Sequence, residues 1–467
     1  MSGAAVVIGG GLAGMLAASA LLDHVDAVTV IERDRYPDGP EFRKGVPQAR
    51  HPHILLGGGI RAMTELLPGA EAALLEAGAH RLDVPRDLLA RFPDGWWRRH
   101  DERRQAFLSC TRPMLDHVVR GLLSQAAERS STRVDILQAT EAIGLLGTPR
   151  RVSGVRVAER DGDRAERELH ADLVVDASGR GSRAPEWLAE LGHPTPDEDI
   201  LDAGLAYATR VVRLDEPGDR TGIQIHPAPG IPRSGVVLPV EGGNWMVALA
   251  GFQGHQPPTD EAGFLEFAAT LPDPIVHRLL KTAQPCSPIR GFRNTANRRR
   301  KYHLPGGVPE GFVVLADAAC TFNPIYGHGM SVAAFGALAL RGALAQHGVR
   351  PGLAAAVQPA IAGAADVAWN MAVAADRPYA SGDSTSSSVL ERLRNRYLAR
   401  LYARAGHDPV VCGALCEVIT LEAAPSLLVS PSILLRTLLP PRRPGLSTPP
   451  QQVTASGGRR AFAGKTS

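Results

Sequence analysis

Three glycines near the start of the chain have the spacing of a phosphate-binding turn. Gly9, Gly11 and Gly14 follow the apolar residues 6–8 and precede residues 15–18, whose composition favours a helix. Gly9 permits the tight turn, Gly11 lets the backbone approach a pyrophosphate, and Gly14 lets the helix pack against the strand. The N-terminus of that helix faces the phosphates. The chemistry that these residues favour is therefore the binding of a dinucleotide.

An acidic residue supports this interpretation. A second strand is predicted over residues 27–31 and ends in Glu32, eighteen residues after Gly14. An acid at this distance binds a ribose hydroxyl in dinucleotide-binding folds. The combination favours a dinucleotide site over a glycine-rich turn that packs close to nothing. A second glycine run, residues 57–59, follows an apolar segment too short for a βαβ unit, so we expect it to begin a helix.

The composition is that of a soluble globular protein with two or three packed units. Of the 467 residues, 44% are hydrophobic, and the net charge is only +3. So small a net charge argues against a nucleic-acid partner. The five cysteines are scattered and odd in number, which favours a reducing compartment and no disulfide framework.

We expect no metal site and no membrane span. Cys412 and Cys416 would share a helix face, and His51 and His53 lie two residues apart, but neither pair has a third ligand nearby. The sequence has no run of about 18 apolar residues and no room for a signal peptide before the first strand. These features predict a cytoplasmic protein. The apolar residues 426–439 leave three alternatives: contact with a membrane surface, a wall of an apolar channel, or ordinary packing, which we favour.

Two later strands are predicted to end in polar loops. Residues 173–175 are apolar and lead into a loop that contains Asp176 and Gly179. Residues 312–315 are also apolar, and Asp317 and an alanine-rich helix follow them. In doubly wound sheets, ligands bind at the carboxyl ends of the strands. Both loops are therefore candidates for the same site as the glycines.

One helix start between these segments carries an arginine. Thr111 is suited to cap a helix and Pro113 to occupy its first turn. Arg112 lies between them, so its guanidinium is well placed to contact a phosphate or an adenine.

The sequence predicts an α/β fold with a discontinuous doubly wound domain. In residues 200–289, apolar and polar side chains alternate with a period of two, which is typical of a sheet with two unlike faces. The buried strand pattern then returns near residue 312. The predicted division is 1–199 with 290–345 for the nucleotide-binding domain, 200–289 for a β-sheet domain that binds substrate, 346–441 for a helical region, and 442–467 for a disordered tail.

Three segments together resemble a known family. Residues 9–32, 176–182 and 317–331 have the order and approximate spacing of the single-component FAD-dependent monooxygenases, typified by para-hydroxybenzoate hydroxylase and squalene epoxidase. More narrowly, residues 43–51, 208–210 and 323–331 look like the flavin epoxidases of polyether antibiotic biosynthesis, of the lasalocid and monensin type. The late motif of the family usually reads Gly-Asp-Ala-Ala-His, whereas this chain has Ala316 before the aspartate and Cys320 in place of the histidine.

The resemblance implies a para-hydroxybenzoate hydroxylase-like fold and non-covalent FAD. It implies that Asp317 binds the ribityl and pyrophosphate groups and that residues 324–331 pass along the flavin ring, whereas the residues alone leave a helix N-cap as an alternative for Asp317. The cofactor-binding residues that it implies are Gly9, Gly11, Leu12, Ala13, Gly14, Glu32, Arg33, Arg43, Lys44, Val46, Arg112, Asp176, Gly179, Asp317, Pro324, Gly327, Gly329, Met330 and Ser331.

The resemblance also implies an oxidoreductase with NADPH or NADH as a transient reductant. In this family, oxygen reacts with the reduced flavin to form a flavin hydroperoxide, which oxidises the substrate. Our leading hypothesis is the epoxidation of alkenes in a lipophilic polyene or polyketide. An alkene needs no deprotonation, and no side chain is predicted as a catalytic base, although His226 and His328 are available. The alternatives are an aromatic hydroxylase, a flavin-dependent reductase of isoprenoid double bonds, and a non-catalytic flavin or nucleotide module.

Overall fold

The computed structural model describes residues 3–100, 105–161, 164–214, 221–228, 230–380, 389–439 and 445–450, with only the backbone at residues 390 and 391. Most of the tail predicted over 442–467 therefore lies outside the described residues. No helix in the described ranges is long and apolar enough to cross a membrane.

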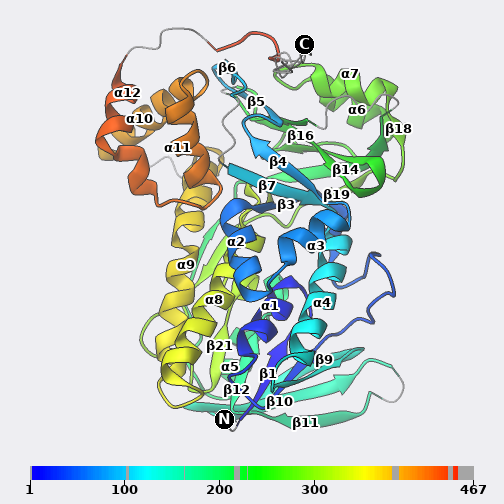
Figure 1. Cartoon of the computed structure of the whole chain (residues 1–467), viewed down its shortest axis with the longest axis vertical. Helices are drawn as coiled ribbons and strands as arrows, with labels where there is room; N and C mark the ends of the chain where they lie inside the picture. The colour runs from blue at the N-terminus through cyan, green and yellow to red at the C-terminus, as the bar shows by residue number, and fades with distance from the viewer. Residues whose placement is uncertain are drawn as a thin grey trace, which may run out of the picture.

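A five-stranded parallel sheet carries the N-terminal glycines at the carboxyl end of its central strand, and three of its strands, β1, β12 and β21, are labelled in Figure 1. Its strand order is β21-β12-β1-β2-β8. The bounds are β1 Ala4–Ile8, β2 Ala27–Ile31, β8 Arg133–Leu137, β12 Leu173–Asp176 and β21 Phe312–Val314. Because β21 pairs with β12 although far from it in sequence, the sheet is built from two separate parts of the chain, as predicted.

Alternate residues of β1 are buried against different layers. Ala5 and Val7 pack among helices, whereas Val6 and Ile8 pack on a three-stranded antiparallel sheet and a short helix. The helical layer comprises α1 Leu12–Leu21, α2 Gly57–Leu66, α3 Ala70–Glu76, α4 Arg112–Glu128, α8 Gly329–His347 and α9 Leu353–Asp376. The opposite layer comprises β9 Thr140–Thr148, β10 Arg151–Glu159, β11 Glu166–His170 and α5 Ala184–Glu190.

The second glycine run begins a helix, as predicted. Helix α2 starts at Gly57, and the strand before it, β3 (His53–Leu56), pairs antiparallel with β7 (Gln105–Cys110). Strand β3 and helix α2 therefore do not belong to a βαβ unit. A Cβ on Gly59 would lie 2.3 Å from Oγ of Ser331 in α8. Gly59 therefore lets α2 and α8 pack closely together.

The second sheet has eight strands and is covered by α6 Glu261–Ala269 and α7 Ile275–Thr282. Its order is β18-β14-β17-β16-β15-β5-β6, and β19 also pairs with β14. Strands β5 and β6 come from residues 88–96, which lie in the segment assigned to the nucleotide-binding domain in the predicted division. The bounds are β5 Leu88–Phe92, β6 Gly95–Trp96, β14 Ala206–Arg213, β15 Gly222–Ile225, β16 Arg233–Val240, β17 Asn244–Gly251, β18 Gln284–Pro285 and β19 Arg290–Phe292.

Two small sheets join the larger ones. Their orders are β3-β7-β4 and β13-β20-β22. The bounds are β3 His53–Leu56, β4 His80–Val84, β7 Gln105–Cys110, β13 Glu198–Leu201, β20 Asn297–Arg300 and β22 Cys320–Thr321. Short 3-10 helices are η1 Pro47–Arg50, η2 Gly179–Gly181, η3 Glu241–Gly243, η4 Ala316–Ala318, η5 Pro324–Tyr326, η6 Arg377–Tyr379 and η7 Pro425–Val429.

The C-terminal helices form a group beyond α9 (Figure 1). They are α10 Val389–Ala405, α11 Pro409–Ile419 and α12 Pro431–Leu438. The apolar segment 426–439 packs only in part: Leu428 and Ile433 are buried, whereas Leu434, Leu435 and Leu438 are exposed.

Candidate cofactor site

Two of the N-terminal glycines are required by the packing of the chain itself. Gly9 has a φ of 98°, and a Cβ there would lie 2.7 Å from the carbonyl oxygen of Ala177. A Cβ on Gly14 would lie 1.7 Å from the carbonyl oxygen of Gly9. Gly9 therefore makes the turn and Gly14 lets α1 pack against the strand, as the spacing predicts.

Gly11 differs from these two because its side faces open space. The nearest atoms to a Cβ at Gly11 are the Nη2 atoms of Arg112 and Arg43, both at 3.9 Å. Leu12 and Ala13 follow in the first turn of α1, where backbone N–H groups have no acceptor within the helix. Unpaired amides and two guanidinium groups around an open position fit an anionic pyrophosphate.

Glu32 is buried beside this position and is held by several donors. Its Oε2 accepts from the Gly10 amide at 3.0 Å, and its Oε1 accepts from the Asp34 amide at 2.9 Å. Arg43 Nη1 forms an ion pair with Oε2 at 2.8 Å. Glu32 thus lies at the end of β2 with a fixed orientation, as a ribose-binding acid requires.

The other predicted residues of this loop have different surroundings. Arg33 and Lys44 are exposed, and Val46 is buried. Nη2 of Arg33 donates to the carbonyl of Gly45 at 3.2 Å. Their roles toward a cofactor stay predictions.

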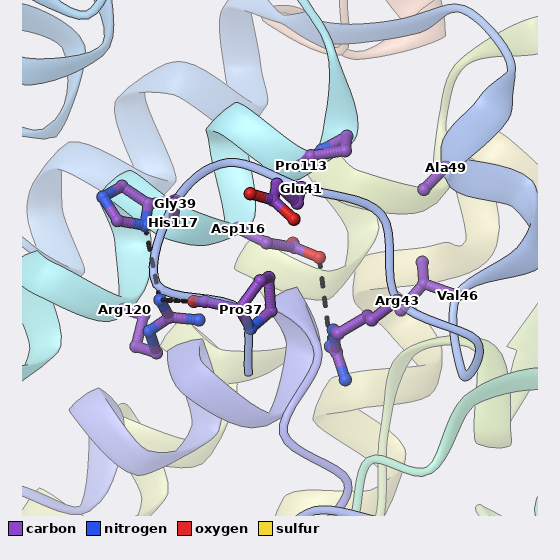
Figure 2. A pocket seen from close by; sticks show the side chains of 10 residues that line it. All are labelled: Pro37, Gly39, Glu41, Arg43, Val46, Ala49, Pro113, Asp116, His117 and Arg120. Atoms are coloured by element: carbon purple, nitrogen blue, oxygen red, sulfur yellow. Dashed lines mark hydrogen bonds and ion pairs between the residues drawn. The ribbon is translucent and has the colours of Figure 1, made fainter. Parts of the chain in front are cut away.

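Helix α4 and the loop before η1 enclose a pocket next to Arg43 (Figure 2). Figure 2 shows Asp116 and Arg43 pointing toward each other across it, with Oδ2 and Nη2 4.0 Å apart. Nε of Arg112 donates to the other oxygen of Asp116 at 2.7 Å. Asp116 therefore holds the guanidinium of Arg112 and lies within ion-pair distance of that of Arg43, the two groups that flank Gly11, and no predicted motif contained it. Its i, i+4 spacing from Arg112 on the predicted helix is the signal that was available.

Thr111 caps α4 as predicted. Its Oγ1 accepts from the Met114 amide at 3.4 Å, and Pro113 lies in the first turn. This cap fixes the helix start and with it the buried side chain of Arg112.

Asp176 and Gly179 lie in the loop after β12, where the aspartate is tied to its own loop. Oδ1 of Asp176 accepts from the amide of Ser178 at 2.9 Å, and Oδ2 accepts from Oγ of Ser182 at 2.5 Å. The residue is completely buried, which raises the pKa of its carboxyl, while the bonds from the two serines lower it. These contacts shape the loop, and the cofactor role assigned to Asp176 and Gly179 stays a prediction.

Asp317 has a carboxylate without a donor among the described residues. Its Oδ1 would lie 3.5 Å from a Cβ on Gly329, so it faces the start of α8. Burial raises the pKa of its carboxyl above the usual value, and the nearby Arg180 and Arg112 offset only part of this rise. The residues that cap η4 and α8 are Leu315 and His328, so the helix-cap alternative for Asp317 lacks support. A partly buried acceptor of this kind fits hydroxyl donors of a ribityl chain.

The two departures from the family motif have different consequences. Ala316 has a φ of 54°, in the left-handed region that glycine adopts without strain. Cys320 is buried, and burial raises the pKa of its thiol to about 12.

Residues 324–331 form a turn that leads into α8. Gly327 has a φ of 67°, and a Cβ there would lie 2.6 Å from Cγ1 of Ile54. Pro324 is exposed, Met330 is buried, and α8 begins at Gly329. The turn thus places the N-terminus of a long helix beside Asp317, where its partial positive charge favours an anionic group.

Two residues outside the predicted set of cofactor-binding residues join distant segments. The hydroxyl of Tyr36 donates to the carbonyl of Gly10 at 2.7 Å. Nη1 of Arg180 donates to the carbonyl of Ala296 at 2.9 Å, and Nη2 donates to that of Phe322 at 3.1 Å. Arg180 thereby links the middle loop to the late motif. No local pattern marks either residue.

Comparisons with known proteins agree with this geometry. Residues 3–350 match the family described as FAD binding domain. Protein Rv3254 of Mycobacterium tuberculosis is 32% identical over 346 residues, which cover 73% of this chain and 72% of that protein. Kynurenine 3-monooxygenase of Salinispora arenicola is 28% identical over 422 residues, which cover 87% of this chain and 88% of that protein.

A solved structure supports the fold. OxyS anhydrotetracycline hydroxylase from Streptomyces rimosus has a TM-score of 0.59 at 15% identity, over 90% of this chain and 76% of that one. The likeness is one of fold, and it agrees with the predicted para-hydroxybenzoate hydroxylase-like arrangement. FAD is therefore the cofactor that the open position at Gly11 and the free acceptor at Asp317 fit. The chain belongs to the FAD binding domain family and is a flavoprotein.

Proposed function

We propose that this protein epoxidises alkenes of a lipophilic polyene or polyketide substrate, with NADPH or NADH as the reductant and oxygen as the co-substrate. Bound FAD would supply the activation of oxygen. The turn that leads into α8, residues 323–331, is here called the flavin-side turn. The observation that carries the proposal is the apolar surrounding of this turn. Ile325 in that turn packs on a cluster that includes Leu205, Tyr207 and Phe252 of the second sheet region.

The protein's part in this reaction is to bind, orient and exclude water. Gly11, Arg43 and Arg112 would hold the pyrophosphate, Glu32 the ribose and Asp317 the ribityl chain. The N-terminus of α8 would favour negative charge at the edge of the flavin ring. An apolar wall would hold an alkene in place without any polar anchor, and its position there decides which double bond reacts.

The nearby histidines support an alkene rather than a phenol as the substrate. His328 is buried, and burial lowers its pKa to about 4. His51 is buried too, and burial, His53 and Arg50 lower its pKa to about 3. Rings with such low pKa values are weak bases, and they would abstract a phenol proton poorly.

Aromatic hydroxylation is the second candidate, because a relative at 28% identity is named kynurenine 3-monooxygenase. Labelled oxygen gas separates the two. The FAD-loaded protein is supplied with NADPH, labelled oxygen and either a long apolar polyene or a phenol, and the products are analysed by mass spectrometry.

We expect one labelled oxygen atom in an epoxide of the polyene. Label in phenols but never in alkenes would establish the hydroxylase instead. Saturated alkenes without label would establish a reductase. Absence of NADPH consumption with every substrate would favour a non-catalytic flavin module. The Gly11→Val variant, prepared in parallel, controls for oxidation that does not depend on bound FAD.

A further inference from the structure

Asp376, the last residue of α9, has a buried carboxylate and belongs to none of the motifs identified in the sequence. It is 1% exposed. The groups around it come from two other segments: Asn297 begins β20, and Asn323 and Tyr326 flank Pro324 and Ile325 in the flavin-side turn. Three distant parts of the chain therefore meet at one carboxylate.

Each oxygen of this carboxylate accepts two hydrogen bonds. Oδ1 accepts from the hydroxyl of Tyr326 at 2.5 Å and from Nδ2 of Asn323 at 3.1 Å. Oδ2 accepts from Nδ2 of Asn323 at 2.9 Å and from Nδ2 of Asn297 at 2.6 Å. All three donors are neutral. The first and the last residue of the turn 323–326 are thus held by the same group.

Two further bonds complete the network. The amide of Asn323 donates to Oδ1 of Asn297 at 2.8 Å, and Oδ1 of Asn323 accepts from the amide of Ile325 at 3.3 Å. Asn323 therefore caps the turn with one end of its carboxamide and contacts Asp376 with the other. Burial raises the pKa of Asp376, while bonds from Tyr326, Asn323 and Asn297 lower it.

A buried carboxylate is a poor means of stabilising a fold. Removing its charge from water costs several kcal/mol, and no described basic side chain forms an ion pair with Asp376. Apolar packing at the end of α9 would stabilise the fold without this cost. What the carboxylate adds is geometry, because four directed bonds allow the turn only one position relative to α9.

We infer that Asp376 is a positioning residue that fixes the turn 323–326, and through it the start of α8, against the flavin ring. The placement of the ring beside this turn rests on the proposed function, whereas the network itself does not. Loss of the carboxylate should disturb the ring end of the site and leave the adenosine end, at Gly11 and Glu32, intact.

The test compares FAD-loaded wild type with Asp376→Asn, Tyr326→Phe and Asp408→Asn. Asp408 is the matched control, because it is a buried aspartate that caps α11 away from the turn. The measurements are the visible absorption of the bound flavin, the rate of its reduction by NADPH, the Kd for FAD and the melting temperature.

We expect Asp376→Asn to shift the flavin absorption and to slow reduction about 10-fold, with the Kd for FAD changed less than about 3-fold. Tyr326→Phe removes one donor, so it should act in the same direction and to a smaller extent. Asp408→Asn should lower only the melting temperature.

Wild-type spectra and reduction rates in both Asp376→Asn and Tyr326→Phe would overturn the inference and leave a structural role. Should Asp376→Asn not fold, Tyr326→Phe still decides between these outcomes. None of the readouts requires an epoxide, so failure of the proposed substrate class and failure of this inference are distinguishable.

Discussion

At Gly11 the absence of a side chain leaves room between two guanidinium groups, and this residue is the sharpest point at which to disturb the cofactor. Gly11→Val would place methyl groups where the pyrophosphate binds. We expect a loss of about 3 kcal/mol or more, which is roughly 100-fold in Kd, in a fluorescence titration with FAD.

The control for this substitution is Gly342→Val in α8, where a Cβ would have no neighbour within 4 Å. It should bind FAD as wild type does. A Gly11→Val protein that retains stoichiometric FAD would show that the pyrophosphate lies elsewhere.

Asp317 offers a second test, because its carboxylate has no donor from the described chain. Asp317→Ala should weaken FAD binding by about 1.5–3 kcal/mol, since the cofactor would lose hydrogen bonds to a charged acceptor. Equilibrium dialysis against FAD measures the change. Asp317→Asn keeps an acceptor without the charge, so its affinity for FAD should lie between those of wild type and Asp317→Ala. Unchanged affinity together with a lower melting temperature would return Asp317 to a structural role.

Among the elements, the turn from β21 into η4 contains a strained residue. Ala316 has a φ of 54°, whereas Ala319, at the other end of the same short helix, has a φ of −96° and is unstrained. Ala316→Gly should therefore raise the free energy of unfolding by roughly 0.5–1 kcal/mol, the strain relieved less the added entropy of the unfolded chain.

Ala319→Gly is the matched substitution and should lower the free energy of unfolding by about 0.5–1 kcal/mol. Urea denaturation of both variants checks the pair. Equal destabilisation by the two glycines would mean that the turn at Ala316 carries no strain.

The sequence predicted those elements whose signals are local. The glycine spacing identified β1, α1 and the turn between them, and the Thr111 cap marked the start of α4. The predicted return of the chain to the parallel sheet near residue 312 is confirmed by the pairing of β21 with β12. Each of these signals lies within a short stretch of the chain, although the pairing of β21 with β12 joins two stretches that are far apart.

What the sequence did not predict depends on residues far apart. Strand β5 joins the second sheet by pairing with β15, 134 residues later at Leu88 and Gly222. Asp376 reaches Asn297 across 79 residues. Such pairings follow from tertiary packing, and a single sequence contains no periodicity that marks them.

At the scale of the whole molecule, buried neutral histidines predict loss of stability in acid. Nδ1 of His51 contacts Oγ1 of Thr209 at 2.8 Å, and burial first, then His53 and Arg50, lowers its pKa to about 3. The unfolded chain takes up a proton near pH 6.5, and the folded chain does not. The stability that neutral His51 contributes is therefore fully present above about pH 6.5 and is lost as the pH is lowered toward 3.

We expect His51 to account for about 2 kcal/mol of the loss between pH 7.5 and pH 5. Urea unfolding at the two pH values, with wild type and His51→Gln, measures it. The variant should show a smaller difference between the two pH values. An equal difference in both proteins would mean that His51 titrates alike in the folded and unfolded states.

The central claim is that one connected site holds FAD from Gly11 to the start of α8. A crystal structure with FAD tests it directly. We predict the pyrophosphate at the Gly11 amide between Arg43 and Arg112, a ribose hydroxyl on Glu32, the ribityl chain on Asp317, and the flavin ring beside residues 324–329. Electron density that places the pyrophosphate away from Gly11, or the ring away from this turn, would contradict the account.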